Sequence, residues 1–240
     1  MSTNSYCKYI LLFLACVLLA FFGFAGCRNP NGEKVNPTAV AERAKLCFSL
    51  SVDPNVYTQT RYKKPPQFAL WIEGPAGSEI RTVWVTDKTG AGSWGGKTTR
   101  PVSLPYWSSR WRKETGSSGF PTTANPVIDA LTGATPKQDL TCEIEVPAKS
   151  TWSCYVEINA SGDYNETFAE VLKDGKRDQH GNGQPSIIYK GQIEAVPGKR
   201  CVLRLVGRTD QLESVDHIIP DMEGISTAKN LLSKIEITCK

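Results

Sequence analysis

The feature that most constrains this chain is a series of short segments, rich in alternating apolar residues, that Gly, Pro and Asp interrupt. The clearest pair is residues 68–73 (Phe-Ala-Leu-Trp-Ile-Glu) and residues 80–86 (Ile-Arg-Thr-Val-Trp-Val-Thr), which flank Gly-Pro-Ala-Gly at residues 74–77. Two such segments around a turn signal predict a β-hairpin. The further strand candidates are residues 46–52, 142–146, 152–159, 187–195, 201–206 and 233–239.

These eight predicted strands, with polar segments between them and little helical periodicity, indicate an all-β fold. We expect an immunoglobulin-like antiparallel β-sandwich with long loops, extending over residues 43–240. One short helix is expected at residues 104–114. Pro105 suits its first turn, and Tyr106, Trp107 and Trp111 recur at helical spacing.

The first 27 residues have the pattern of a bacterial export signal. Lys8 is their only charged residue, and an uninterrupted apolar run from Tyr9 to Ala25 follows it. Residues 24–27 (Phe-Ala-Gly-Cys) resemble a lipoprotein box, in which cleavage before the cysteine leaves its thiol free to carry diacylglycerol. We therefore expect a lipoprotein signal peptide over residues 1–26 and lipid attachment at Cys27.

An uncleaved transmembrane anchor is the alternative, since a run of about 17 apolar residues lies at the lower limit for spanning a bilayer. In either case the rest of the chain lies in the cell envelope, facing the periplasm or the cell surface. Residues 27–42 are polar, contain Pro and Gly and have no periodic apolar face, so they predict a flexible tether. The net charge of +4 is too small to indicate nucleic-acid binding.

Five cysteines lie beyond the predicted signal and lipid site: Cys47, Cys142, Cys154, Cys201 and Cys239. No Cys-x-x-Cys pair occurs, and the two histidines, His180 and His217, have no metal-like spacing, so the sequence predicts no metal site. An oxidising compartment permits disulfides. The first strand holds Cys47 and the last holds Cys239. Because chain termini often approach each other in compact domains, we expect these two to be linked.

Residues 129–135 (Asp-Ala-Leu-Thr-Gly-Ala-Thr) form the most distinctive motif of the chain. Asp129 can accept backbone N–H bonds two or three residues further on, as in an Asx-turn or a helix N-cap. Gly133 and Ala134 leave the backbone open to close approach by a phosphate or an enzyme pocket. The alternative is a structural turn whose threonines bond to nearby backbone groups.

Two hydroxyls of this motif compete as acceptors of a modification. Thr132 is better placed to bond back toward Asp129, whereas Thr135 follows the two smallest residues of the motif. Pro136 biases Thr135 toward extended geometry and forbids continuation of a helix. The segment is therefore expected to display the Thr135 hydroxyl beside a bare backbone.

The motif fits the pattern Asp-x-x-Ser/Thr-Gly-Ala-Ser/Thr and resembles the site at which periplasmic flavin transferases attach FMN through a threonine phosphoester. It is also similar to the core of an uncharacterised periplasmic family, domain of unknown function 2271. Further likeness to that family lies in residues 68–83, 104–107 and 183–189. The resemblance implies covalent FMN on Thr135, attached by a separate flavin transferase that uses FAD and Mg²⁺.

Trp107 and Trp111 have two interpretations. Aromatic residues at positions i and i+4 of a helix most often pack in a core. In the functional interpretation they form an aromatic wall for a flavin ring, and the neighbouring Arg110, Arg112 and Lys113 lie near its phosphate or its anionic reduced form.

The residues and the resemblance together predict an extracytoplasmic electron-transfer lipoprotein that carries covalent FMN. It would be held to a membrane by its lipid anchor and exchange electrons with a membrane redox partner. Neither a Ser-His-Asp nor a Cys-His arrangement occurs, so the protein is predicted to have no catalytic residues.

Two other function classes compete. A non-redox immunoglobulin-like envelope module would bind a protein or glycan through Trp94, Trp107 and Trp111 and through a mobile loop at residues 89–93. A hydrolase would use Asp174, Asp178 and His180, although a solvated Gly/Asn loop over residues 173–183 explains these three side chains.

Overall fold

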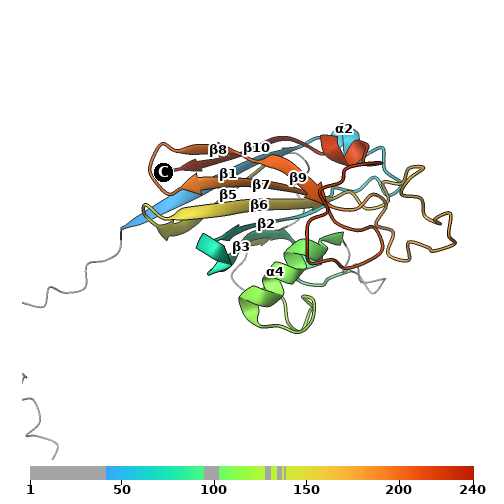
Figure 1. Ribbon diagram of the computed structural model, residues 1–240, viewed down its shortest axis with the longest axis horizontal. Helices are drawn as coiled ribbons and strands as arrows, with labels where there is room; N and C mark the ends of the chain where they lie inside the picture. Colours follow the sequence, from blue (N-terminus) through green and yellow to red (C-terminus); the bar gives the residue numbers. More distant parts are fainter. Residues whose placement is uncertain (1–41, 95–102, 128–130, 134–136, 138) are drawn as a thin grey trace, which may run out of the picture. The chain divides into compact units, whose positions relative to one another are not determined.

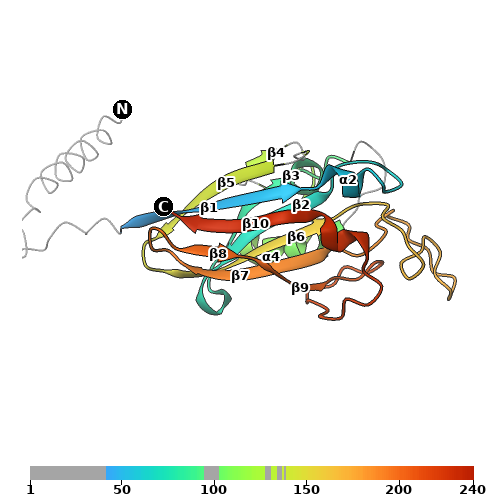
Figure 2. The ribbon, with the colours of Figure 1, turned by 90° about the horizontal axis from the view of Figure 1, so that it is seen from above.

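Two β-sheets pack face to face in the computed structural model, which describes residues 42–94, 103–127, 131–133, 137 and 139–240 (Figure 1, Figure 2). The four-stranded sheet has the order β5 (Asp139–Pro147), β1 (Arg43–Val52), β10 (Leu232–Cys239) and β8 (Arg200–Val202). The six-stranded sheet has the order β4 (Leu131–Gly133), β3 (Ile80–Thr86), β2 (Gln67–Glu73), β6 (Thr151–Asn159), β7 (Ile187–Glu194) and β9 (Arg204–Arg208). The predicted β-sandwich is confirmed.

Pairing between these strands is antiparallel, with one exception: β4 runs parallel to β3. The predicted hairpin is formed by β2 and β3, which turn through the short 3-10 helix η1 (Pro75–Gly77). Ala76 and Gly77 both have positive φ there, at 54° and 70°. Gly77 meets this requirement at no steric cost, which is why a Gly-rich segment marks the turn.

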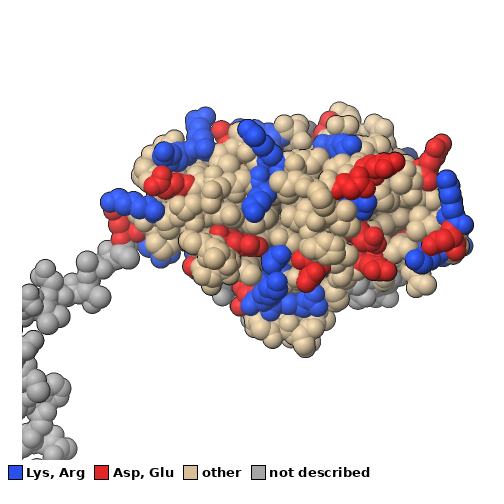
Figure 3. Space-filling model, viewed as in Figure 1, with Lys and Arg blue, Asp and Glu red and all other residues tan. Residues whose placement is uncertain are grey.

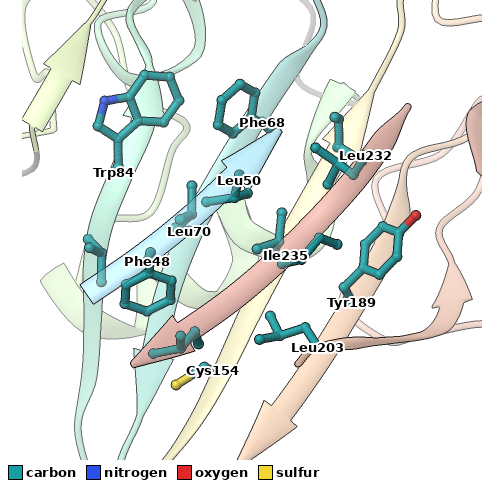
Figure 4. Close-up of a cluster of buried hydrophobic side chains, with 14 of the residues drawn as sticks. Phe48, Leu50, Phe68, Leu70, Trp84, Cys154, Tyr189, Leu203, Leu232 and Ile235 are labelled. Carbon is teal, nitrogen blue, oxygen red and sulfur yellow. The ribbon is translucent and has the colours of Figure 1, made fainter. Parts of the chain in front are cut away.

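The main core fills the space between the two sheets. Along β1 the inward side chains of Leu46, Phe48 and Leu50 are at most 1 % exposed. Figure 4 shows Phe48 and Leu50 among side chains of the opposite sheet, which include Phe68 and Leu70 of β2. Complete burial of one large apolar side chain contributes about 1.5–3 kcal/mol, so this inter-sheet core is the main source of stability.

A second, smaller core lies on the outer face of the six-stranded sheet, beneath helix α4 (Pro105–Thr115). Figure 1 shows the helix lying against that sheet. Pro105 occupies the first turn and Gly116, with φ of 71°, ends the helix in the left-handed conformation. The helix predicted at residues 104–114 is thus present, shifted by one residue.

The segment predicted as one strand at residues 201–206 is divided between the sheets. Its first part is β8, at the edge of the four-stranded sheet, and its second part is β9, at the edge of the six-stranded sheet. Only Leu203 separates them, and its N–H still donates to Ile235 O of β10. The chain therefore crosses from one sheet to the other within a single residue.

Three further short helices occur in the described residues: α2 (Pro54–Tyr57), α3 (Asp87–Gly90) and the 3-10 helix η3 (Thr227–Asn230). Helix α3 corrects the expected mobile loop at residues 89–93. Thr89 and Gly90 are buried, and Gly92 packs so closely that a Cβ on it would lie 2.6 Å from Thr122 Cα. The segment is a packed turn because Gly92 adopts a φ of 62° and brings two backbones together.

The expected Cys47–Cys239 disulfide is wrong, because the two side chains lie on opposite faces of the four-stranded sheet. In the β1–β10 ladder, Cys47 lies opposite Thr238 and Cys239 lies opposite Leu46. Side chains alternate between the two faces of a strand, so Cys239 joins Leu46 in the core while Cys47 faces outward. Proximity of the two strands was predicted correctly, but the face of each sulfur was not.

None of the helices in the described residues is long and apolar enough to cross a bilayer. The apolar run from Tyr9 to Ala25, the predicted lipid site Cys27 and the predicted tether up to Ala41 lie outside those residues. Strand β1 begins at Arg43, the residue at which the sandwich domain was expected to begin. Basic and acidic side chains are interspersed on the face shown in Figure 3.

Candidate functional site

Three of the seven residues of the sequence motif at 129–135 form a strand at the edge of the six-stranded sheet. Leu131, Thr132 and Gly133 make up β4, and they pair with Trp84, Val85 and Thr86 of β3. β4 is the last strand in the sheet order, so among the described residues one of its sides has no neighbouring strand in that sheet. Asp129, Ala130, Ala134 and Thr135 lie outside the described residues.

A buried polar cluster lies at the end of β3 and includes Thr86, the residue that pairs with Gly133. The Thr86 and Thr89 hydroxyls both donate to Gln67 Oε1, at 2.8 and 3.0 Å. All three side chains are buried. Because these bonds hold β2, β3 and α3 together, the end of β3 offers a rigid base for β4.

A cleft of about 650 Å³ opens along the preceding part of β3. Its walls come from β3, from the last turns of α4, from β5 and from the segment that leads toward the motif. The lining residues include Arg81, Val83, Trp111, Thr115, Asn125 and Ile144. An aromatic ring, aliphatic side chains and several hydrogen-bonding groups thus surround one space, as in many small-molecule sites.

Glu114 is the carboxylate that α4 contributes to this cleft. It accepts hydrogen bonds from the N–H and the hydroxyl of Thr82, and the latter bond is 2.8 Å long. Burial raises the pKa of Glu114, while the Thr82 bonds oppose that shift. On the opposite wall, Arg81 donates to Glu145 O at 2.8 Å and so ties β3 to β5 across the edge of the sandwich.

The tryptophans of α4 differ in their relation to this cleft. Trp107 is fully buried and donates from its indole to Thr82 Oγ1 at 3.2 Å. Trp111 is 2 % exposed, and it lines the cleft. Both belong to the core beneath α4, in agreement with the core interpretation of their spacing.

The basic residues of α4 have structural partners. Arg110 donates to Tyr106 Oη at 2.8 Å, stacks over the Tyr106 ring and lies 3.5 Å from the carboxylate of Glu73. Arg112 stacks over the ring of Phe120. These contacts hold Arg110 against the six-stranded sheet and Arg112 against an aromatic ring.

A buried carboxylate that the sequence analysis did not single out anchors the start of α4. Glu157 of β6 is fully buried and accepts from the N–H groups of Tyr106 and Trp107, at 3.3 and 2.6 Å. The Ser186 hydroxyl donates to the same carboxylate at 2.6 Å. Leu104, the N-cap residue, supplies no side-chain bond, so Glu157 provides the cap from another element. Burial raises the pKa of Glu157 to about 7, although the three donors oppose the shift.

The Gly-Gln-Pro-Ser element at residues 183–186 has a structural role in the described fold. A Cβ on Gly183 would lie 2.4 Å from Asp163 N. Gln184 donates to Asp163 Oδ2 and accepts from Ser226 N, both at 2.7 Å. The element thereby joins the loops at one end of the sandwich, while Ser186 reaches Glu157.

The two carboxylates weighed as hydrolytic have ordinary structural surroundings. Asp178 is buried and accepts from the backbone N–H groups of His180 and Gly183 and from the Tyr164 hydroxyl. It therefore organises its own loop. Asp174 is instead exposed, and its carboxylate lies 3.5 Å from Lys176 Nζ. Within the described part of the chain, no group of three or more His, Cys, Asp or Glu residues is placed to hold a metal ion.

Comparison of the chain with protein-family models, with curated proteins and with solved structures finds no match.

Proposed function

We propose that the protein is an extracytoplasmic electron-transfer lipoprotein that carries FMN, linked through a phosphoester to Thr135. The observation that supports this most is the position of β4. The middle of the flavin-attachment motif, residues 131–133, forms the outermost described strand of a sheet, and the acceptor threonine follows two residues later in the sequence. A transferase needs to reach this hydroxyl, and a segment that continues from an edge strand suits that requirement better than one from a central strand.

The cleft beside β3 supplies groups that fit a flavin. Its volume of about 650 Å³ lies within the usual range for small-molecule sites, roughly 300–1,000 Å³. Trp111 would provide an aromatic surface, while Asn125 and Arg81 would hydrogen bond to polar atoms of the ring or of the ribityl chain. FMN, when attached, supplies the one- and two-electron chemistry, and these residues would set its orientation and exposure.

Attachment itself is a phosphoryl-type group transfer that a separate transferase catalyses. The Thr135 oxygen forms a bond to the phosphorus of the FMN half of FAD, the bond between the two phosphates breaks, and AMP leaves. The hydroxyl proton passes to a base of the transferase. This chain contributes only the acceptor hydroxyl and the open backbone of Gly133 and Ala134.

A covalent link suits the proposed location, because a cofactor outside the cytoplasm would otherwise be lost by dilution. Lipid on Cys27 would keep the domain near a membrane redox partner. The competing binding module would lose two of its expected contact groups, since Trp107 is fully buried and residues 89–93 form a packed turn.

The test is co-expression of the full chain with a periplasmic flavin transferase. The wild-type protein is expected to be yellow and fluorescent and to gain the mass of one FMN less one water. Thr135→Ala should remove both signals, whereas Thr132→Ala, which deletes the same group three positions earlier, should keep them. A colourless wild-type protein, or equal flavin on the Thr135→Ala variant, would reject the function and favour the binding module.

A further inference from the structure

The face of the sheet on which each sulfur lies excludes most pairings among the cysteines. Cys47 faces outward, with its Sγ 3.7 Å from the carboxylate of Glu143, whereas Cys142 and Cys239 face the core. Side chains on opposite faces of one sheet point apart and cannot be bridged. Cys142 and Cys239 share a face, but β1 lies between their strands, which separates them by about 10 Å. No disulfide is possible at that distance.

Cys154 and Cys201 are arranged differently, because they approach each other from opposite sheets. Cys154 of β6 is fully buried in the inter-sheet core, where Figure 4 shows it near Leu203. Cys201 of β8 is half-buried and packs against the same core from the four-stranded sheet. Both sulfurs therefore enter the same space.

The two sheets converge where these residues lie. Sheets in a sandwich are usually about 10 Å apart. Here the chain passes from β8 to β9 through Leu203 alone, and Arg204 already pairs with Lys190 of β7. Residues of β7 and β8 consequently approach to within 8 Å at their Cα atoms, although the strands belong to different sheets.

Gly191 makes room for the sulfur of Cys201 beside Cys154. Gly191 of β7 is the direct cross-strand partner of Cys154. A Cβ on Gly191 would lie 2.5 Å from Cys201 Sγ, so this sulfur occupies the space that a side chain at residue 191 would fill. Cβ positions of directly opposed residues are about 4.5–5.5 Å apart, which places Cys201 Sγ within reach of the Cys154 side chain. We propose that Cys154 and Cys201 form a disulfide that joins the two sheets.

The reaction requires a disulfide oxidant, such as oxidised glutathione or a thiol–disulfide exchange protein. One cysteine thiolate attacks a sulfur of the oxidant and releases one thiol. The second cysteine then attacks the mixed disulfide and releases the other. The two protein thiols lose two protons and two electrons, and the oxidant gains them as two thiols. Burial raises the pKa of the Cys154 thiol, so bond formation is expected while the chain folds, before the core closes.

The test uses the full chain, reduced and unfolded, then refolded in a mixture of oxidised and reduced glutathione. Free thiols are blocked under denaturing conditions, and trypsin peptides are analysed without reduction. We expect one linked pair that joins residues 150–173 to residues 201–204, with Cys142 alkylated. Alkylation of both Cys154 and Cys201, or linkage of either to another cysteine, would overturn the proposal.

Four variants test the linkage further. Cys201→Ser should abolish the linked peptide, whereas Cys142→Ser, a matched change at another inward-facing cysteine, should leave it in place. Gly191→Ala should reduce the linked fraction, since its methyl group takes the position of Cys201 Sγ. Thr135→Ala should not alter the linkage. Failure of the disulfide and failure of flavin attachment are therefore separate outcomes.

Discussion

We predict that the stability of the protein depends on pH through Glu157, because this carboxylate has an unusual pKa in the folded protein. It is fully buried and its pKa is raised from 4.5 to about 7. The folded protein therefore holds this proton at pH values where the unfolded chain has lost it. The contribution of Glu157 to the free energy of unfolding is therefore largest below about pH 4.5. This contribution is lost as pH rises to about 7. A difference of 2.5 pKa units corresponds to about 3 kcal/mol at 1.36 kcal/mol per unit.

The perturbation is Glu157→Gln, which keeps the shape of the side chain and removes its titration. Its amide oxygen can still accept from Trp107 N, and its NH₂ group can donate to the Ser186 hydroxyl. The weaker bond from Tyr106 N, at 3.3 Å, is the one that we expect to be lost. At pH 5 the wild type should thus be more stable by about 1 kcal/mol, the typical contribution of one hydrogen bond.

The assay is urea unfolding between pH 5 and pH 8, with the difference between wild type and variant as the readout. Between pH 5 and pH 8 this difference should shift by about 2–3 kcal/mol toward the variant, because the first part of the full effect lies below pH 5. Burial also raises the pKa values of Glu114 and Asp163, but these groups are present in both proteins and cancel. Glu143→Gln is the control, since Lys45 lowers the pKa of this exposed carboxylate and any effect has the opposite sign. A flat difference curve would refute the assigned ionisation of Glu157.

Three further predictions follow from packing and from the N-terminus. Trp107→Ala should lower the free energy of unfolding by about 3–5 kcal/mol in chemical denaturation, because the indole is fully buried; a loss under 1 kcal/mol would show that α4 is not packed as described. Gly183→Ala should cost about 3 kcal/mol, through positive φ and a clash with Asp163. Gly198→Ala is the control, because Gly198 has a φ of 87° but open space around it, and it should lower the free energy of unfolding by less. Equal losses of stability in thermal melts of the two variants would contradict the close approach of Gly183 to Asp163. Cys27→Ser should release the domain from membranes on fractionation without altering its unfolding, and full retention of the variant would favour the transmembrane anchor.

Local signals were sufficient for the parts of the fold that neighbouring residues determine. Pro105 and Gly116 flank α4, and the alternation along residues 68–86 produces the β2–β3 hairpin, so both could be predicted. The division of residues 201–206 between the two sheets could not be predicted, because the chain crosses at Leu203 to whichever sheet edge has no other strand. Side chains alternate between the two faces of a strand, so the pairing register of β1 and β10 decides on which face Cys47 and Cys239 lie. That register could not be predicted from one sequence.

Glu157 shows why the candidate site was harder to predict. It stands in an alternating strand, where a carboxylate is ordinarily expected on a solvated face. It is buried because α4, about 50 residues earlier in the chain, covers that face and presents two free N–H groups to it. The motif at residues 129–135 was recognisable from residue types alone, yet its pairing with β3 required the fold.

The most direct test of flavin attachment is the mass of one tryptic peptide after co-expression with a flavin transferase. Cleavage after Lys113 and Lys137 releases residues 114–137, which contain Thr115, Thr122, Thr123, Thr132 and Thr135. We predict one FMN on this peptide, linked through phosphate, with fragment ions that place it on Thr135. An unmodified peptide from protein made beside an acceptor that is modified, or an FMN on any of the other four threonines, would contradict the proposed site.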